Sequence, residues 1–487
     1  MLFNSVDFTI FFPCIFFLYW FFFNKSLKLQ NAFIIASSYV FYGWWDWRFL
    51  ILLFLSTCAD FFIGLQMEKH PAKEARKTLF IISLLINLGM LCFFKYFNFF
   101  VDSFVNAFNL FGLQLEKRTL EIILPVGISF YTFQSITYTY SVYQQKLKAT
   151  SDGIAFFAYV CFFPQLVAGP IERAPHFLPQ FLNKRSFNSE QARDGLRQIL
   201  WGLFKKVVIA DNCAVMVNEI FAQYDILPGS TLFLGAFLFS IQIYCDFSGY
   251  SDMAIGLAKL LNFELMQNFS TPYLSKNIAE FWRRWHISLS TWFRDYIYIP
   301  MGGNRKGKWR TALNVMVLFL ISGFWHGANW TFIAWGAVHG LLFLPLLLLN
   351  KTKENNSLNQ QKTLWTGISD IWKIGFTYFL VIIAWIFFRA ENISKATHYI
   401  QKIFTLSAYN KQALVSTYNY IYYNSYFVYL FIVLLFITER IQKDKKHSLE
   451  LNPFRIPKAF RWSFYFIIVM CIVYYKGSPQ NFIYFQF

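Results

Sequence analysis

The stretch FTIFFPCIFFLYWFFF at residues 8–23 contains no charged residue and consists almost entirely of aromatic and aliphatic side chains. Such a run favours a helix in the hydrocarbon core of a bilayer, where a full crossing takes about 20 residues. Comparable runs recur at about 31–45, 49–66, 79–94, 120–143, 153–168, 231–245, 311–325, 329–349, 371–388, 425–438 and 461–475. The pattern predicts an all-α, polytopic integral membrane protein with about ten to twelve transmembrane or re-entrant segments.

The overall composition supports a membrane protein. Of the 487 residues, 56% are hydrophobic and 14% are charged, whereas soluble domains have about 25% charged residues. The 44 Lys and Arg residues outnumber the 26 Asp and Glu residues, and they lie in short clusters between the apolar runs. This is the positive-inside pattern rather than a nucleic-acid surface. We therefore expect one membrane-embedded domain over residues 1–487, in contact with the lipid bilayer and without a nucleic-acid partner.

The basic clusters also predict an orientation in the cell (inner) membrane. The first apolar run lacks a preceding basic segment and is followed by Lys25 and Lys28, which indicates a retained span with the amino terminus outside. Three crossings then place the basic connector 67–78 in the cytoplasm. The connector 303–310 is equally basic, and we expect it on the cytoplasmic side as well.

Several common kinds of site are missing from the sequence. The seven cysteines show neither a pairing pattern nor a CxxC motif, so neither disulfides nor a metal site is predicted. There is also no GxGxxG, P-loop or GxSxG motif. We expect no tightly bound cofactor, and any chemistry must be centred on histidine.

Three of the seven histidines, His286, His326 and His339, lie in or beside apolar runs. An ionisable side chain at membrane depth is costly and suggests function, although a lone histidine can also be a satisfied structural residue. His326 lies between Gly323 and Gly327, so other groups can approach it closely. Near neutral pH an imidazole can take a proton from a hydroxyl that attacks a thioester. We expect this role for His326 and a packing hydrogen bond for His339.

The segment 281–296, within the string FWRRWHISLSTWFRDYIY that begins at 281, concentrates charge and aromatic side chains around His286. If the segment is one helix, one of its faces could line a passage, and that face carries Trp282, His286, Ser290 and Phe293. The arginines could bind phosphate or pair with Asp295. A purely structural cluster of ion pairs is the alternative.

Two acidic residues, Asp246 and Asp252, lie among small residues in IYCDFSGYSDMAIG at 243–256. The pair could hold a cation or a proton, as in a transporter. Alternatively, each caps a broken helix or pairs with an arginine, and this structural interpretation is favoured. A secondary transporter would also predict inverted repeats, which the sequence does not show.

Seven long strings run along the chain. They are LPVGISFYTFQSITY at 124, FFPQLVAGPIER at 162, GLFKKVVIADN at 202, YCDFSGYSDMAIGLAKLLNF at 244, FWRRWHISLSTWFRDYIYIPMGGNR at 281, SGFWHGANWTFIAWGAVHG at 322 and AWIFFRAENISKA at 384. Nearly end to end, the sequence resembles the membrane-bound O-acyltransferase superfamily. Within it, the likeness is to the bacterial branch that includes the alginate O-acetylation and teichoic-acid D-alanyl transfer proteins.

The resemblance implies a ring of tilted helices around a tunnel that joins a cytoplasmic acyl donor to an outer acceptor. The family's catalytic histidine, in its WHG motif, falls on His326, and its second polar position falls on His286. The second histidine would orient or polarise the acyl carbonyl. The other residues expected to line the tunnel or bind substrate are Trp282, Arg284, Trp285, Trp325, Asn329 and Asp295.

The chain length, the WHGANW string and the terminal FIYFQF are more similar to the alginate-type branch than to the D-alanyl branch. The resemblance thus implies an O-acetyltransferase that uses acetyl-CoA or another acyl thioester and acts on an exported or cell-wall polysaccharide. In alginate-type systems a separate extracytoplasmic SGNH-hydrolase-like protein completes the transfer, and we expect such a partner. The alternatives are D-alanyl transfer to teichoic acid and a polytopic transporter or flippase.

Overall fold

The computed structural model describes residues 1–487 apart from 114, 116–118, 168, 350–363, 425, 444, 451–456 and 484–487. Helices joined by turns and loops make up these described residues, and no strand occurs among them. The last residues of the terminal FIYFQF string, 484–487, lie outside this description. The described residues form two compact units, Met1–Ile199 with Met253–Met266, and Leu200–Asp252 with Gln267–Phe487. The interpretation of residues 1–487 as one domain stays a prediction.

Five helices in the described part of the chain are long and apolar enough to cross a membrane, or six if one bent pair forms a single span. The five are Arg48–Lys69, Lys73–Leu110, Gly229–Leu260, Trp330–Leu348 and Ile368–Arg389, and the bent pair is Lys411–Tyr423 with Phe427–Ile441. Several other apolar runs form helices too short for a full crossing, as their lengths suggested. The prediction of an all-α, multi-pass membrane protein is confirmed.

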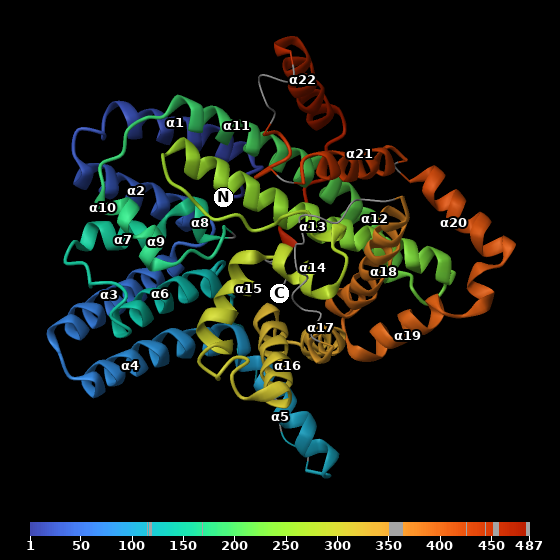
Figure 1. Cartoon of the computed structure of the whole chain (residues 1–487), viewed down its shortest axis with the longest axis horizontal. Coiled ribbons are helices and arrows are strands. Elements are labelled where there is room, and N and C mark those ends of the chain that lie inside the picture. The colour runs from blue at the N-terminus through green and yellow to red at the C-terminus, as the bar shows by residue number, and fades with distance from the viewer. Residues whose placement is uncertain are drawn as a thin grey trace. The chain divides into compact units, whose positions relative to one another are not determined.

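The first unit contains a layer in which α3, α4 and α6 lie side by side (Figure 1). Its helices are α1 (Val6–Phe21), α2 (Leu27–Gly43), α3 (Arg48–Lys69), α4 (Lys73–Leu91), α5 (Phe97–Leu110), α6 (Ile128–Tyr143), α7 (Gly153–Cys161), α8 (Phe163–Leu166), α9 (Ala174–Phe177), α10 (Pro179–Leu182) and the beginning of α11 (Ser189–Phe204), with a π-helical turn η1 (Cys92–Tyr96). Inside the layer, the buried Asp60 carboxylate accepts hydrogen bonds from Ser83 Oγ at 2.7 Å and Asn87 Nδ2 at 2.9 Å. The hydrogen-bond donors to the Asp60 carboxylate are thus uncharged side chains.

The second unit contains all three histidines of interest. Its helices are α12 (Asp211–Ala222), most of α13 (Gly229–Leu260), α14 (Ile278–Arg284), α15 (Ile287–Phe293), α16 (Gly307–His326), α17 (Trp330–Leu348), α18 (Leu364–Arg389), α19 (Ile393–Ile403), α20 (Lys411–Tyr423), α21 (Phe427–Ile441) and α22 (Lys458–Tyr474), with the short turns η2 (Lys205–Ala210), η3 (Pro272–Leu274), η4 (Arg294–Tyr298) and η5 (Leu406–Tyr409). Asparagine side chains mark several helix starts, because their oxygens accept hydrogen bonds from backbone N–H groups of the first turn. Asn277 caps α14 in this way, and Asn329 caps α17.

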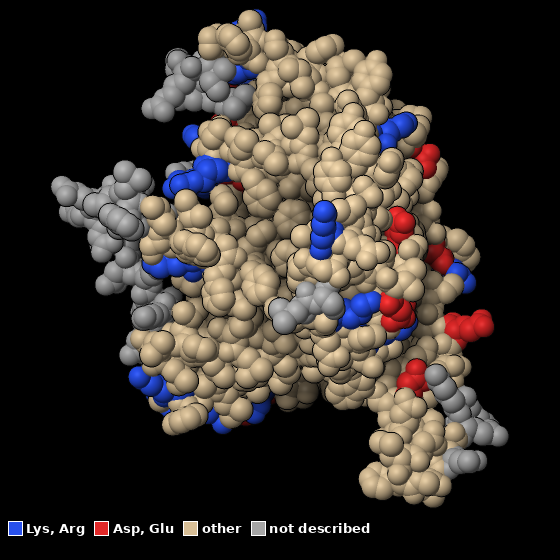
Figure 2. Space-filling view, turned by 90° about the vertical axis from the view of Figure 1, so that its right-hand side faces the viewer, with Lys and Arg blue, Asp and Glu red and all other residues tan. Residues whose placement is uncertain are grey.

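Much of the exposed surface is apolar, as a protein facing lipid requires. Figure 2 shows a face on which Lys, Arg, Asp and Glu side chains are scattered among uncharged ones. Large hydrophobic side chains such as Phe54, Phe62 and Leu85 are exposed on α3 and α4. Extended exposed apolar surface is rare on soluble monomers and indicates contact with another apolar phase.

Helices α16 and α17 pack together through glycines at very short range. A Cβ atom on Gly323 would lie 2.2 Å from the carbonyl oxygen of Phe332, and one on Gly336 would lie 2.3 Å from that of Phe319. Small residues let helix backbones approach closely in membrane proteins, where packing replaces the hydrophobic effect as the driving force. This contact fixes the position of His326, because that histidine is the last residue of α16.

We expect Gly336→Ala to destabilise the protein, because the new methyl group would collide with backbone rather than with a movable side chain. Overpacking of this kind typically costs about 1–3 kcal/mol. Thermal unfolding of the detergent-solubilised protein measures the effect. Gly375→Ala in α18 is the matched control, because a Cβ there meets no atom within 4 Å. Equal melting temperatures for the two variants would show that the α16–α17 contact is not as close as described.

Candidate active site

The helix considered over residues 281–296 is broken at His286. Helix α14 ends at Arg284, α15 begins at Ile287, and His286 between them has a φ of 42°. This left-handed conformation is uncommon and strained for a residue other than glycine. The expected helical face shared by Trp282 and His286 was therefore wrong, because the break turns the imidazole in a direction that a continuous helix would not allow.

Two main-chain hydrogen bonds brace the break from the segment before η3. The N–H of Ile287 donates to the carbonyl of Asn268 at 2.9 Å, and the N–H of Ser270 donates to the carbonyl of Arg284 at 3.0 Å. Backbone groups at helix ends need such partners because no intrahelical bond satisfies them. The Asn268 side chain also reaches the imidazole, with its Oδ1 atom 3.1 Å from His286 Nδ1.

The structure brings both predicted histidines to one tryptophan. The Trp325 ring centroid lies 6.2 Å from that of His286 and 4.9 Å from that of His326. The His326 ring also contacts Trp335 at 5.1 Å and Phe388 at 5.3 Å. Both histidines are almost fully buried, with 0% and 3% of their surfaces exposed. The two imidazoles therefore lie in a dry, aromatic environment.

Burial favours the neutral form of His286. His286 lies between α14 and α15, and these helices of seven residues each are not membrane-spanning segments. Burial lowers its pKa from 6.5 to about 3, because the protein interior solvates the charged imidazolium poorly. At neutral pH the side chain is therefore an uncharged imidazole.

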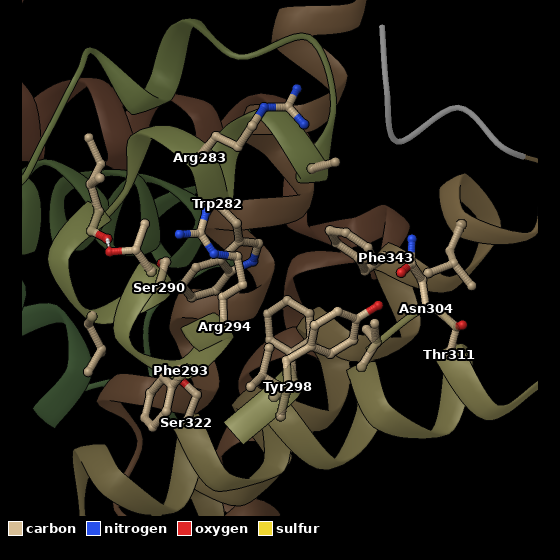
Figure 3. A pocket seen from close by; sticks show the side chains of 18 residues that line it. Trp282, Arg283, Ser290, Phe293, Arg294, Tyr298, Asn304, Thr311, Ser322 and Phe343 are labelled. Carbon is tan, nitrogen blue, oxygen red and sulfur yellow. Dashed lines mark hydrogen bonds between the residues drawn. The ribbon is translucent and has the colours of Figure 1, made fainter. Parts of the chain in front are cut away.

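A cavity of about 520 Å³ opens among α14, α15, η4, α16 and α17 (Figure 3). Its volume falls in the range of small-molecule sites, which is roughly 300–1,000 Å³. The lining is mainly apolar and consists of Ala279, Trp282, Arg283, Ile287, Leu289, Ser290, Thr291, Phe293, Arg294, Tyr298, Asn304, Thr311, Val315, Leu318, Phe319, Ser322, Phe343 and Leu347. Two of the lining rings contact tryptophans that pack against His326. The ring centroids of Phe293 and Trp325 are 6.4 Å apart, and those of Trp282 and Trp335 are 5.7 Å apart.

Trp282 lines this cavity, and Asp295 contacts a residue that lines it. Trp282 also donates its Nε1–H to His339 Nδ1 at 3.3 Å. This contact confirms the packing hydrogen bond that we expected for His339. Asp295 pairs with Arg294, a lining residue, at 2.8 Å. Thus one arginine of the cluster does pair with Asp295.

The other predicted residues have mainly structural contacts in the described part of the chain. Arg284 pairs with Glu280 at 2.6 Å and donates to Thr271 Oγ1 at 3.1 Å, and it is not among the lining residues. Trp285 is buried in an aromatic cluster, 5.0 Å from Trp385. Asn329 caps α17 and donates to the carbonyl of Glu391. The predicted roles of these residues in the tunnel stay predictions.

Sequence reasoning missed Asn268 and Tyr298, and it considered Arg283 only as one of several arginines that could bind phosphate. The first is 18 residues from its partner His286, and no local pattern announces the contact. Arg283 and Tyr298 line the cavity. Both occur in the string FWRRWHISLSTWFRDYIY that begins at 281, so its high density of Arg and aromatic residues was the available signal.

Asp246 and Asp252 are both held by lysines. Lys206 Nζ lies 2.7 Å from Asp246 Oδ1 and 2.8 Å from Asp211 Oδ1, while Lys205 Nζ lies 2.7 Å from Asp252 Oδ2. The π-helical turn η2 presents two consecutive lysines to α13. Ion pairing was expected, but with arginine. The expected helix caps were wrong, because α13 runs unbroken through both acids.

The C-terminal segment reaches the same cluster of charges. The N–H of Ile483 donates to Asp246 Oδ2 at 2.7 Å, and Lys206 donates to the carbonyl of Gln480 at 3.1 Å. The buried Phe482 ring lies 6.0 Å from that of Phe247. Asp246 and Asp252 therefore have structural roles, because their ion pairs and hydrogen bonds join α13 to η2 and to the C-terminal segment. Among the described residues, no group of three or more His, Cys, Asp or Glu side chains is placed to hold a metal ion.

Comparison with known proteins adds a family and several relatives. Residues 38–390 match the model of MBOAT, the membrane-bound O-acyltransferase family. The chain is 40% identical to the probable alginate O-acetylase of Pseudomonas aeruginosa, over 80% of this chain and 72% of that protein. It is 35% identical to the peptidoglycan O-acetyltransferase of Helicobacter pylori, over 76% and 73%. A more distant relative is the teichoic acid D-alanyltransferase of Bacillus subtilis, 30% identical over 45% and 58%. The matched region contains both histidines and the whole cavity.

Proposed function

The chain belongs to the membrane-bound O-acyltransferase family, and we propose that it passes an acetyl group from a cytoplasmic thioester across the membrane for O-acetylation of a polysaccharide. Family membership makes it a multi-pass membrane O-acyltransferase. The observation that supports the proposed chemistry is the placement of two buried histidines against Trp325, next to a cavity of substrate size.

Acetyl is the proposed acyl group because the relatives with the widest matches are named as O-acetylating proteins. The D-alanyltransferase relative is less similar and is matched over a smaller share of both chains. Alginate and peptidoglycan, the polymers in the relatives' names, are both polysaccharides outside the cytoplasm. The proposed acceptor is accordingly an exported or cell-wall polysaccharide. D-alanyl transfer to teichoic acid remains the second candidate.

We propose His326 as the general base. A neutral imidazole takes the proton from the attacking hydroxyl, whose oxygen then bonds to the thioester carbonyl carbon. The C–S bond breaks, the thiolate leaves, and the imidazolium returns the proton to the sulfur. The rings of Trp325, Trp335 and Phe388 around His326 exclude water that would otherwise hydrolyse the thioester.

The cavity is the proposed donor site. Its apolar lining suits the flexible arm of an acyl thioester, while Arg283 and Arg294 can bind phosphate groups through charge-assisted hydrogen bonds. Asn304, another lining residue, lies in the basic stretch 303–310, which includes the first turn of α16. The positive-inside rule places that stretch, and with it the donor, on the cytoplasmic side. The same rule supports an amino terminus outside.

An extracytoplasmic SGNH-hydrolase-like protein is the proposed partner that completes transfer to the polymer, in keeping with the similarity to the alginate O-acetylase. A transporter or flippase is the weaker alternative. It would need Asp246 and Asp252 for coupling, and each is engaged by a lysine in the described structure.

His326→Ala should nearly abolish acetyl transfer, because a positioned general base contributes about 10² to 10⁴ in rate. The measurement is the O-acetyl content of polymer from deletion cells complemented with each variant, at matched membrane abundance. His339→Ala is the matched control, since this histidine is also buried but already accepts a hydrogen bond from Trp282. Its effect should be much milder. Near-normal acetylation by well-folded His326→Ala would refute the mechanism.

Ser322→Leu should weaken use of the donor, because the larger side chain would occupy the cavity about one turn before His326. We expect the KM for the acyl thioester to rise by at least about tenfold, which corresponds to about 1.4 kcal/mol. Leu313→Phe is the control on the same helix, because Leu313 is exposed and does not line the cavity. An unchanged KM for a stable Ser322→Leu protein would argue that the donor binds elsewhere.

A further inference from the structure

The amide of Asn268 lies at the centre of a small polar cluster behind His286. Asn268 is buried, with 1% of its surface exposed. Three groups lie within hydrogen-bond distance of its Oδ1 atom: Ser288 Oγ at 2.8 Å, His286 Nδ1 at 3.1 Å and Ser288 N at 3.3 Å. One side chain thus contacts both the imidazole and the first turn of α15.

The backbone N–H of Ser288 fixes which end of the amide faces the cluster. A main-chain N–H can only donate, so the atom that receives it must be the amide oxygen and not the NH₂ group. The same oxygen faces His286 Nδ1, and a carbonyl oxygen can only accept. Nδ1 must therefore hold the hydrogen. A neutral imidazole has a single N–H, so the lone pair of His286 is on Nε2.

We infer that Asn268 is a positioning residue that locks His286 in the Nδ1–H tautomer, so that Nε2 can accept a hydrogen bond from a donor group of the substrate other than the hydroxyl that His326 deprotonates. This inference rests on the proposed function for the identity of the substrate, but the tautomer itself does not. It revises the expectation that the second histidine polarises the acyl carbonyl. A carbonyl oxygen needs a hydrogen-bond donor, and the Nε2 of this tautomer is an acceptor.

The surroundings of His286 hold the ring in one orientation. The Phe247 ring lies edge-on at 4.7 Å between centroids, and the Phe269 ring is stacked at 6.4 Å. These contacts restrict rotation of the imidazole, which would otherwise exchange Nδ1 for a carbon atom at Asn268. Burial between aromatic rings also disfavours the charged form, which would have no lone pair on either nitrogen.

The main chain of Asn268 also holds the segment around His286 in place. The carbonyl of Asn268 accepts from the N–H of Ile287, the residue after His286, at 2.9 Å. Asn268 therefore supports the strained backbone of the histidine with its main chain and sets the tautomer with its side chain. A histidine partner of this kind fixes which ring nitrogen is available for chemistry, as second partners of metal-binding histidines do.

The tautomer can be observed by ¹⁵N NMR of protein labelled at its histidines. We expect the imidazole signal that disappears in His286→Gln to report hydrogen on Nδ1 in the otherwise unaltered protein. Asn268→Ala should lose that preference. Asn268→Asp should keep it, because a carboxylate oxygen accepts the same hydrogen bonds. In the control Ser288→Ala, which removes one donor but leaves the His286–Asn268 contact, the Nδ1–H form should persist.

Transfer rates from the same preparations complete the test. Asn268→Ala should reduce acetyl transfer on the order of 10- to 100-fold, the loss typical when a histidine's orienting partner is removed, and Asn268→Asp should restore most of it. A hydrogen on Nε2 in the unsubstituted protein would overturn the inference, even if Asn268→Ala fails to fold. So would full activity of a folded Asn268→Ala protein. An Nδ1–H signal in a protein that transfers no acetyl group would instead refute the proposed function.

Discussion

A helix that breaks in a buried part of a protein leaves backbone N–H and C=O groups that need hydrogen-bond partners. At the α14–α15 break the protein itself supplies those partners, through Asn268 and Ser270. This brace permits the left-handed backbone of His286 and determines where its imidazole points. Without it, the residues around the break would continue as an ordinary helix, and His286 would lose both its contact with Asn268 and its place beside Trp325.

The position of His326 depends on a different constraint. His326 ends α16, and α16 is held against α17 by glycines whose neighbours are backbone atoms. The brace and the glycine contact meet at Trp325, whose ring touches both imidazoles. The two histidines thus come from elements with separate structural causes. A change in either contact is expected to alter their relation without touching the imidazoles themselves.

The sequence predicted the features that depend on local pattern. Runs of apolar residues gave the helices, and His326 between two glycines gave a site where neighbours approach closely. The break at His286 could not be predicted in this way, because residues 278–293 contain no proline or glycine and have the composition of a continuous helix. Its cause is the long-range contact with Asn268. Likewise, the lysine partners of Asp246 and Asp252 depend on a π-helical turn that no sequence pattern indicated.

The proposed function requires this chain for the addition of acetyl esters to a polysaccharide outside the cytoplasm. Mass analysis of ester groups on the exported and cell-wall polymers, from cells with and without the gene, tests it most directly. We expect acetyl esters to disappear on deletion and to return on complementation, while the amount of polymer stays the same. Two other results would contradict the proposed function. One is the loss of D-alanyl esters instead of acetyl esters, and the other is a smaller amount of polymer that is still normally acetylated.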